Sequence, residues 1–408
     1  MTGRPGSRNG GGRRLSPSRR AAGVQPPIIP TVAGWIAETP GTISLGQGVV
    51  HYGPPPEALA AIPEFLRTVP HHTYIPDAGL PELRKAFEAK LRAENGIHAP
   101  FPRRILVTAG ANQAFLNAVL AICDPGDEVI LLSPYYFNHE MAVALASAVP
   151  VIVPTDGMHQ PDLPAIEAAI TGRTRAVVTV SPNNPTGAVY PEETLSAIHR
   201  LCAERGIFHV SDEAYEYFTY GGARHVSPGS LGGEHVISLF SLSKAYGMAS
   251  WRVGFLVAPE RLHDDLMKIQ DTVVVSGPAV SQFVGLRAME EGRGYCSGHL
   301  RSLAHVREEV LSRLGSIPEL LTVPAGRGAF YLFAKVRTEM PAIRLAERLI
   351  REHRVAVIPG ETFGVADGCH LRIAYGSLKE ETVVEGVDRL VNGLKAILRP
   401  GRIPTRDG

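Results

Sequence analysis

The sequence predicts an α/β protein with a large domain on a mostly parallel, seven-stranded sheet and a small α/β domain at the C-terminus. Between Arg104 and Pro259, short β-branched runs alternate with segments whose apolar residues recur at helical spacing. Such alternation is typical of a parallel sheet wrapped by helices. The chain has 408 residues, of which 44% are hydrophobic and 20% charged, so it can bury a core large enough for two lobes.

Seven apolar runs predict the strands of the large sheet. They are Ile105–Thr108, Glu128–Leu132, Val149–Val153, Ala176–Val180, Phe208–Ser211, Val236–Phe240 and Gly254–Val257. Helices are predicted over Ala111–Cys123 and over Pro191–Arg205, where a proline followed by two glutamates is typical of a helix start. Ligands of such sheets bind beyond the carboxyl ends of the strands, so functional residues are expected there.

A second sheet is predicted after a helical stretch from Ser297 to Leu314. Its strands are Gly328–Phe333, Val355–Ile358 and His370–Ala374, and helices over Ala342–His353 and Lys379–Leu398 would cover it. We therefore predict a large domain over 61–300 and a small domain over 301–398, joined by an N-terminal segment over 29–60. Residues 1–28 contain six arginines and no acid among Gly, Pro and Ser, which predicts a disordered basic tail, and 399–408 are expected to be flexible.

Composition argues against several classes of partner. The net charge is +1, from 41 basic and 40 acidic side chains, which provides no field for nucleic acid or anionic lipid. The apolar runs are shorter than the roughly 20 residues that span a membrane. The four cysteines form no CxxC pair, which argues against a disulfide framework and against a zinc site. We expect a cytoplasmic protein without a metal.

Lys244 lies in the run Ser-Leu-Ser-Lys-Ala-Tyr-Gly, where its small hydroxyl neighbours suit an aldehyde cofactor better than solvent. Arg252 follows eight positions later and could supply a cation to a cofactor phosphate. A surface lysine is the alternative for Lys244 taken alone. Together with the residues below, the pattern predicts pyridoxal phosphate.

Three polar residues at strand ends match the needs of the pyridoxal ring. Asp212 would pair with the ring nitrogen, while Tyr215 and Asn184 would donate hydrogen bonds to the ring oxygen. Lys244 would form an imine with the aldehyde and, once displaced by substrate, would act as general base and acid. The alternative for Asp212 is a cap on the following turn.

A phosphate site is predicted where Gly110, Ala111 and Asn112 join a strand to a helix, since free backbone amides and the helix dipole attract anions there. Ser241 and Ser243 would complete it with Arg252. Tyr136 follows another strand end and could stack on the ring, with core packing as the alternative. Arg372 lies inside the predicted strand His370–Ala374 and could bind the substrate carboxylate, with a solvent-facing position as the alternative.

The order of these motifs over residues 30–398 resembles the fold type I, class I and II aminotransferases. The resemblance implies the same roles for Lys244, Asp212, Tyr215, Asn184 and the phosphate-site residues. It further implies that Gly48 and Arg372, together with Asn184, bind the substrate. Tyr74 resembles the tyrosine that reaches the phosphate of the neighbouring subunit, so the resemblance implies a homodimer.

Four segments more narrowly resemble the aromatic and methionine aminotransferases of plants, namely Gln47–His51, Thr108–Phe115, Pro134–Asn138 and Lys268–Asp271. The chain departs from many relatives at Val49-Val50-His51 and at Asn112, which bears on the shape of the pocket. The leading hypothesis is a ping-pong transfer of an amino group from an aromatic amino acid or methionine to a 2-oxo acid.

Two other hypotheses stay open on the sequence. A lyase, cyclase or oxidase of a specialised amino acid would use the same residues, since the reaction depends on which α-carbon bond lies perpendicular to the ring. A transcriptional regulator that only senses the cofactor would need a DNA-binding domain, and a tail of roughly 28 residues is too short for a helix-turn-helix.

Overall fold

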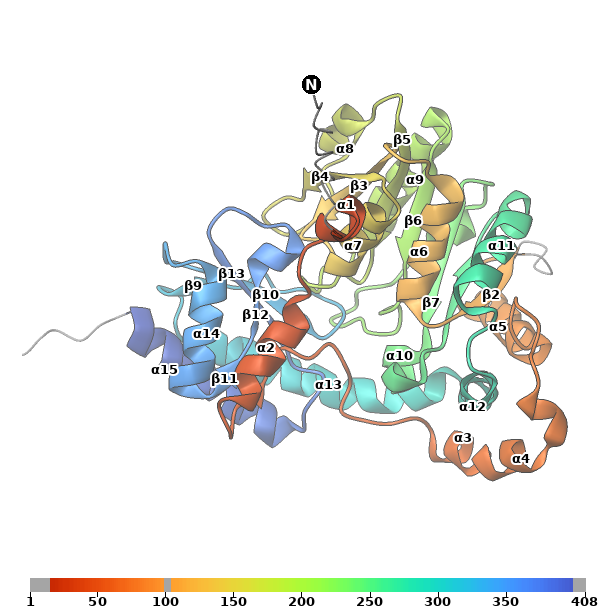
Figure 1. The fold of residues 1–408 in the computed structure, drawn as a ribbon. Coiled ribbons are helices and arrows are strands. Elements are labelled where there is room, and N and C mark those ends of the chain that lie inside the picture. Colours follow the sequence, from red (N-terminus) through yellow and green to blue (C-terminus); the bar gives the residue numbers. More distant parts are fainter. Residues whose placement is uncertain (1–14, 99–103, 399–408) are drawn as a thin grey trace, which may run out of the picture.

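The computed structural model describes residues 15–98 and 104–398. Residues 1–14 of the predicted basic tail and the predicted tail over 399–408 therefore lie outside the described residues. The rest of the basic tail contains a single-turn helix, α1 (Arg19–Ala22), whose first turn is capped by the Ser18 hydroxyl. Helix α2 (Ile28–Ala37) follows and packs against the smaller lobe (Figure 1).

The central feature is a seven-stranded sheet in the order β2-β8-β7-β6-β5-β3-β4. The strands are β2 (Ile105–Thr108), β3 (Glu128–Ser133), β4 (Val149–Pro154), β5 (Thr174–Val180), β6 (Phe208–Asp212), β7 (Val236–Ser241) and β8 (Gly254–Val257). Strand β8 is antiparallel to both of its neighbours, and the other neighbouring strands are parallel. The predicted mostly parallel, seven-stranded sheet is confirmed.

Helices pack on both faces of this sheet, and alternate residues of a strand point to opposite faces. On one face, Val129 and Leu131 pack toward α6 (Ala111–Ile122) and α7 (Phe137–Leu145). On the other face, Ile130 and Leu132 pack toward α8 (Leu163–Ala169) and α9 (Glu192–Arg205). The burial of both faces explains why the strands read as continuous apolar runs.

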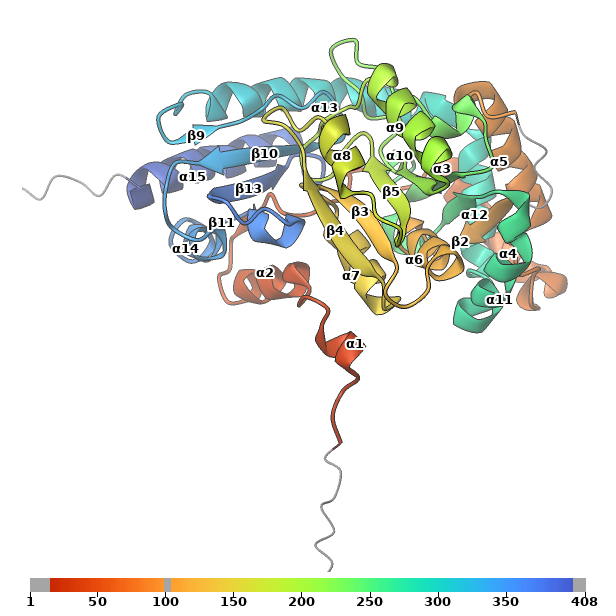
Figure 2. The ribbon, with the colours of Figure 1, turned by 90° about the horizontal axis from the view of Figure 1, so that it is seen from above.

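The remaining helices cover these faces and extend the large lobe (Figures 1 and 2). They are α3 (Pro56–Ala60), α4 (Ile62–Arg67), α5 (Pro81–Glu94), α8 (Leu163–Ala169), α9 (Glu192–Arg205), α10 (Leu242–Ala245), α11 (His263–Val274) and α12 (Ala279–Glu290). Among the described residues, none of the helices is both long and apolar enough to cross a bilayer.

The second lobe is built on a sheet in the order β12-β13-β10-β9. Its strands are β9 (Leu321–Thr322), β10 (Tyr331–Val336), β12 (Ile358–Pro359) and β13 (Cys369–Ala374), and its helices are α14 (Ala342–His353) and α15 (Glu380–Leu398). Helix α13 (Gly292–Leu314) runs beneath both lobes in Figure 1. The N-terminal strand β1 (Ile43–Ser44) pairs with β11 (Val355–Ala356), so the start of the chain joins this lobe.

Two predicted strands of this lobe have different bounds in the structure. The run Val355–Ile358 divides into β11 and β12, which belong to different sheets, because β1 pairs with the first half and β13 with the second. The strand predicted from Gly328 begins at Tyr331, since Gly328 instead donates its N–H to the carbonyl of Gly187 in the large lobe. The domain bounds stay a prediction.

The packing between α5 and β8 gives a stability prediction. The rings of Phe87 and Phe255 are parallel, with centroids 3.8 Å apart, and both side chains are buried. We expect Phe255→Ala to lower the free energy of unfolding by about 3–5 kcal/mol, because it leaves a cavity in the core. Urea unfolding of the cofactor-free protein, followed by circular dichroism, measures this. Val273→Ala, at a side chain that is 49% exposed, is the control with an expected change below about 0.5 kcal/mol. A loss below about 1 kcal/mol in Phe255→Ala would contradict the prediction.

Candidate functional site

Residues from five strand ends meet at one edge of the large sheet. Strands β3, β5, β6 and β7 are parallel, and β2 runs in the same direction because both β2 and β7 are antiparallel to β8. Their carboxyl ends therefore lie at the same edge, where a cavity of about 90 Å³ opens. The cavity is lined by Ala111, Asn112, Tyr136, Val180, Asn184, Asp212, Ala214, Tyr215, Ser241, Ser243, Lys244 and Arg252. Most of the residues predicted from the sequence thus line a single cavity.

Lys244 lies on the short helix α10, directly after β7, and its Nζ donates a hydrogen bond to the carbonyl of Gly48 at 2.6 Å. Burial lowers the pKa of the Lys244 amine to about 8. The nearby guanidinium groups of Arg252 and Arg372 contribute to this lowering, whereas the carboxylate of Asp212 opposes it. A much larger fraction of this amine is therefore neutral near physiological pH than for an ordinary lysine, although most of it stays protonated, which makes Lys244 a candidate nucleophile.

Asp212, the last residue of β6, is held in place from two sides. Its Oδ2 lies 3.1 Å from Nε2 of His139, and its Oδ1 accepts the backbone N–H of Ala214 at 3.1 Å. His139 lies on α7 and stacks on Phe115 of α6, with ring centroids 4.0 Å apart. The carboxylate is 4% exposed and faces the cavity. The next residue, Glu213, points elsewhere and accepts hydrogen bonds from His225 and Ser227.

Tyr215, Asn184 and Arg372 form a connected group across the two lobes. The amide of Asn184 donates to the Tyr215 hydroxyl at 3.4 Å, and its oxygen accepts from Nη1 of Arg372 at 3.0 Å. Arg372 is 2% exposed and also donates to the carbonyl of Gly46 at 2.7 Å. The solvent-facing position considered for Arg372 is therefore wrong, because the strand β13 turns this side chain toward the large lobe.

Arg372 retains hydrogen-bonding capacity that the described residues do not use. Its Nε is buried and has no partner among them, while its guanidinium carbon lies 4.7 Å from the centre of the Tyr331 ring. A buried donor without a partner is uncommon in a folded protein. The geometry is suited to a planar anion such as a carboxylate.

The other end of the cavity has the features of an anion site. Gly110 directly precedes α6 and has a φ of +80°. The backbone N–H groups of the first helical turn have no partner within the helix and can bind an anion there. A Cβ atom on Gly110 would overlap the guanidinium of Arg252, which donates to the carbonyls of Ala109 and Ala249. The Ser241 hydroxyl accepts from the backbone of Ser243 at 3.1 Å.

Tyr136 and Asn112 form part of the wall of the cavity. The Tyr136 hydroxyl accepts from the Asn138 amide at 2.8 Å, and its ring meets His139 edge-on at a centroid distance of 5.3 Å. Burial raises the pKa of Tyr136, so this phenol stays neutral. Tyr74 does not line the cavity of its own chain, and its side chain is 89% exposed.

Sequence reasoning missed His139 and Tyr331. Tyr331 begins β10 and its hydroxyl lies 2.7 Å from that of Tyr215, but in the sequence it reads only as part of an apolar strand. His139 follows Tyr136 by three positions, and the helical spacing that places both side chains near Asp212 could have indicated it.

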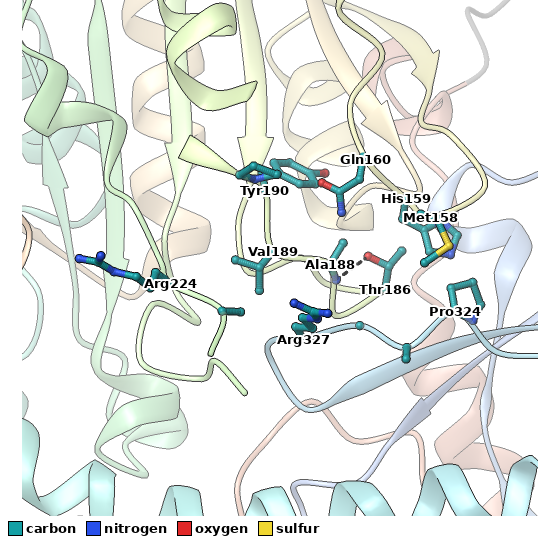
Figure 3. Close-up of a pocket in the computed structure, with 14 residues that line it drawn as sticks. Met158, His159, Gln160, Thr186, Ala188, Val189, Tyr190, Arg224, Pro324 and Arg327 are labelled. Carbon is teal, nitrogen blue, oxygen red and sulfur yellow. Dashed lines mark hydrogen bonds between the residues drawn. The ribbon is translucent and has the colours of Figure 1, made fainter. Parts of the chain in front are cut away.

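A larger cavity of about 400 Å³ lies between the loops at 158–160, 186–191 and 324–327 (Figure 3). Its volume alone would favour it as the functional site, since ligand sites commonly have volumes of about 300–1,000 Å³. Its lining, as far as the structure describes it, contains neither a lysine nor a carboxylate, and the Arg224 side chain points away from the other labelled residues. We therefore place the chemistry in the smaller cavity.

Comparisons with known proteins agree with this geometry. The model of the family "Aminotransferase class I and II" matches residues 40–390. An aromatic aminotransferase of Arabidopsis thaliana is 36% identical over 95% of this chain and 98% of its own. The structure of an aspartate aminotransferase from Thermus thermophilus with maleate has a TM-score of 0.86 and 33% identity over 93% of this chain and all of its own. That of an aromatic aminotransferase from Pyrococcus horikoshii has a TM-score of 0.83 and 32% identity over 90% of this chain and 99% of its own.

The contact between Gly110 and Arg252 gives a prediction for the anion site. We expect Gly110→Ala to raise the Kd for pyridoxal phosphate by at least about tenfold, because the added methyl group displaces the guanidinium and strains a backbone at positive φ. Fluorescence titration of the cofactor-free protein measures this. Gly126→Ala is a matched control, since Gly126 also has a positive φ but has open space around it. Equal Kd values for the two variants would contradict the prediction.

Proposed function

This chain belongs to the aminotransferase class I and II family, and on this premise we propose that the cavity around Lys244 transfers the amino group of an aromatic amino acid or methionine to a 2-oxo acid. The protein is a pyridoxal phosphate-dependent aminotransferase. The observation that carries the assignment of the site is the position of the Lys244 amine between an anion site and a buried arginine.

The residues around the cavity fit the cofactor at three points. The turn at Gly110 and the guanidinium of Arg252 would hold the phosphate, together with the hydroxyls of Ser241 and Ser243. Asp212 would hold the ring nitrogen in its protonated form, since His139 keeps its carboxylate directed at the cavity. Tyr136 would cover the face of the ring.

When bound, the cofactor supplies an electron sink for the bonds of the substrate α-carbon. Lys244 first provides the covalent attachment and then, once released by the substrate, accepts the α-proton at Nζ and returns it to the cofactor side. Its lowered pKa leaves Nζ able to do this near neutral pH. Arg372 and the backbone near Gly48 would orient the substrate carboxylate, and Asn184 would support both Arg372 and the cofactor.

The charges of the site support a neutral substrate side chain. Three cations face the cavity or its border, and each already has a role: Lys244 as nucleophile, Arg252 for the phosphate and Arg372 for the α-carboxylate. Among the described residues that line the cavity there is no further cation for a side-chain carboxylate. Asn112 and Tyr136 instead provide a neutral wall, which suits an aromatic ring or a thioether.

The relatives named above are named either as aromatic or as aspartate aminotransferases. These names favour transamination over the lyase, cyclase or oxidase and over the regulator. The names do not identify the preferred amino acid, so we infer it from the residues that line the cavity.

We further propose a cytoplasmic homodimer in which Tyr74 of each subunit completes the phosphate site of the other. Three exposed apolar side chains lie in the stretch of the chain that leads to Tyr74, namely Leu59, Leu66 and Val69. Exposed apolar side chains in this stretch favour an interface there.

The pKa of Lys244 predicts how fast the cofactor is captured at different pH values. Below pH 8 the amine is mostly protonated, so the rate at which Lys244 bonds to added pyridoxal phosphate should rise about tenfold per pH unit, and it should level off above pH 8. Stopped-flow absorbance on the cofactor-free protein between about pH 6.5 and 9.5 measures this. Lys244→Ala is the control and should retain the spectrum of the free aldehyde, without conversion to the imine band. A rate that still rises tenfold per unit at the upper limit would indicate an ordinary lysine.

The substrate proposal predicts a ranking of amino donors. We expect kcat/KM to be at least about 50-fold higher for phenylalanine or methionine than for aspartate, since a buried carboxylate without a cation costs several kcal/mol. Formation of the amino acid product from 2-oxoglutarate and from phenylpyruvate, measured by chromatography, tests both donor and acceptor. An equal or higher kcat/KM for aspartate would contradict the proposed substrate class while leaving the aminotransferase intact.

A further inference from the structure

Tyr331 has no role in the site as described so far, although its hydroxyl reaches the centre of the site. It begins β10 in the small lobe, is fully buried, and its Oη lies 2.7 Å from that of Tyr215 in the large lobe. A Cβ on Gly48 would come within 2.7 Å of the Tyr331 hydroxyl, and the guanidinium of Arg372 lies over its ring. Tyr331 therefore touches a predicted cofactor residue and the two predicted substrate-carboxylate groups.

The hydrogen bonds around the two phenols decide where their protons lie. Within the part of the chain that the structure describes, the Tyr331 hydroxyl has one hydrogen-bond partner, the oxygen of Tyr215. Either hydroxyl could donate in the bond between the two phenols, and Tyr331 is the donor when Tyr215 gives its own proton to the bound cofactor, as proposed above. The Tyr215 oxygen also accepts from the amide of Asn184 at 3.4 Å. With both of its lone pairs engaged, Tyr215 must direct its own proton elsewhere, and it lines the cavity.

We propose that Tyr331 is a positioning residue, which fixes the proton of Tyr215 toward the ring oxygen of the bound cofactor and strengthens that hydrogen bond. The inference rests on the proposed function, in which Tyr215 meets the ring oxygen. A phenol that accepts a hydrogen bond becomes a better donor, because hydrogen bonds in a chain polarise one another.

Both phenols keep their protons over the pH range in which the cofactor site works. Burial raises the pKa of Tyr331 to about 12 and that of Tyr215 above its usual range. The guanidinium of Arg372 acts in the opposite direction on both. The pair therefore acts as a neutral hydrogen-bond chain that reaches from the small lobe to the cofactor.

The hydrogen bond from Tyr331 to Tyr215 should change the pH dependence of the visible absorbance of the bound cofactor. Hydrogen bonding to the ring oxygen stabilises its negative charge, and this lowers the pH at which the Lys244-bound cofactor loses its proton. Without the Tyr331 hydroxyl, Tyr215 accepts one hydrogen bond fewer and becomes a weaker donor, so its hydrogen bond to the ring oxygen weakens. The midpoint of the pH-dependent change in visible absorbance should then move to higher pH.

The test compares the pH midpoints of four holoenzymes: wild type, Tyr331→Phe, Tyr215→Phe and the double variant. We expect Tyr331→Phe to raise the midpoint by about 0.5 to 1 unit, which corresponds to the net contribution of one hydrogen bond. Tyr215→Phe should raise it at least as much. The double variant should match Tyr215→Phe, because Tyr331 acts only through Tyr215.

Tyr375→Phe is the matched control. Tyr375 is also a fully buried tyrosine of the small lobe, but its hydroxyl donates to the carbonyl of Ala329 at 3.4 Å. We expect its midpoint to equal that of the wild type, which would separate the hydrogen bond from a general effect of losing a buried hydroxyl.

Three outcomes would overturn the inference. An unchanged midpoint in Tyr331→Phe would show that Tyr215 holds its proton unaided. An equal further shift on the Tyr215→Phe background would show that Tyr331 acts by another route. A wild-type protein with no visible band at all would overturn the proposed cofactor site and the inference with it, and is thereby distinguished from the other two.

Discussion

The desolvated amine of Lys244 is the constraint on which the rest of the site depends. Burial and two guanidinium groups lower the pKa of this lysine, while a single carboxylate, Asp212, opposes them. The site therefore carries an excess of positive charge before any ligand binds. Two anionic groups, a phosphate and a carboxylate, would restore the balance, and we propose that Arg252 binds the first and Arg372 the second.

Both lobes contribute residues to this charged site. The large sheet places the amine, the ring partners and the phosphate turn at one edge, because its parallel strands all end there. The small sheet contributes Arg372 and Tyr331, and both reach across to residues of the large lobe through Asn184 and Tyr215. A change in the position of the small lobe would thus alter the carboxylate site and the environment of the cofactor together.

Much of this arrangement could be predicted from the sequence, because the chemistry lies at the ends of apolar runs that are easy to recognise. Asp212 directly follows one such run and Lys244 comes four residues after another. The strands of the large sheet were predicted within one or two residues. His139 and Tyr331 were not predicted, since their roles depend on tertiary contacts. The His139 ring stacks on Phe115 and lies beside Asp212, and Tyr331 reaches Tyr215 from the other lobe. The division of Val355–Ile358 between two sheets was likewise decided by pairing partners that are distant in the sequence.

The most direct test of the account follows the visible spectrum of the holoenzyme through one complete cycle. We predict that phenylalanine or methionine bleaches the band of the Lys244-bound cofactor, at roughly 360–430 nm, and that a 2-oxo acid restores it with release of the corresponding amino acid. Such a return shows that the amino group was carried on the cofactor and passed on. A band that bleaches but is not restored by any 2-oxo acid, with ammonia or a cyclised product in solution, would contradict transamination at this site.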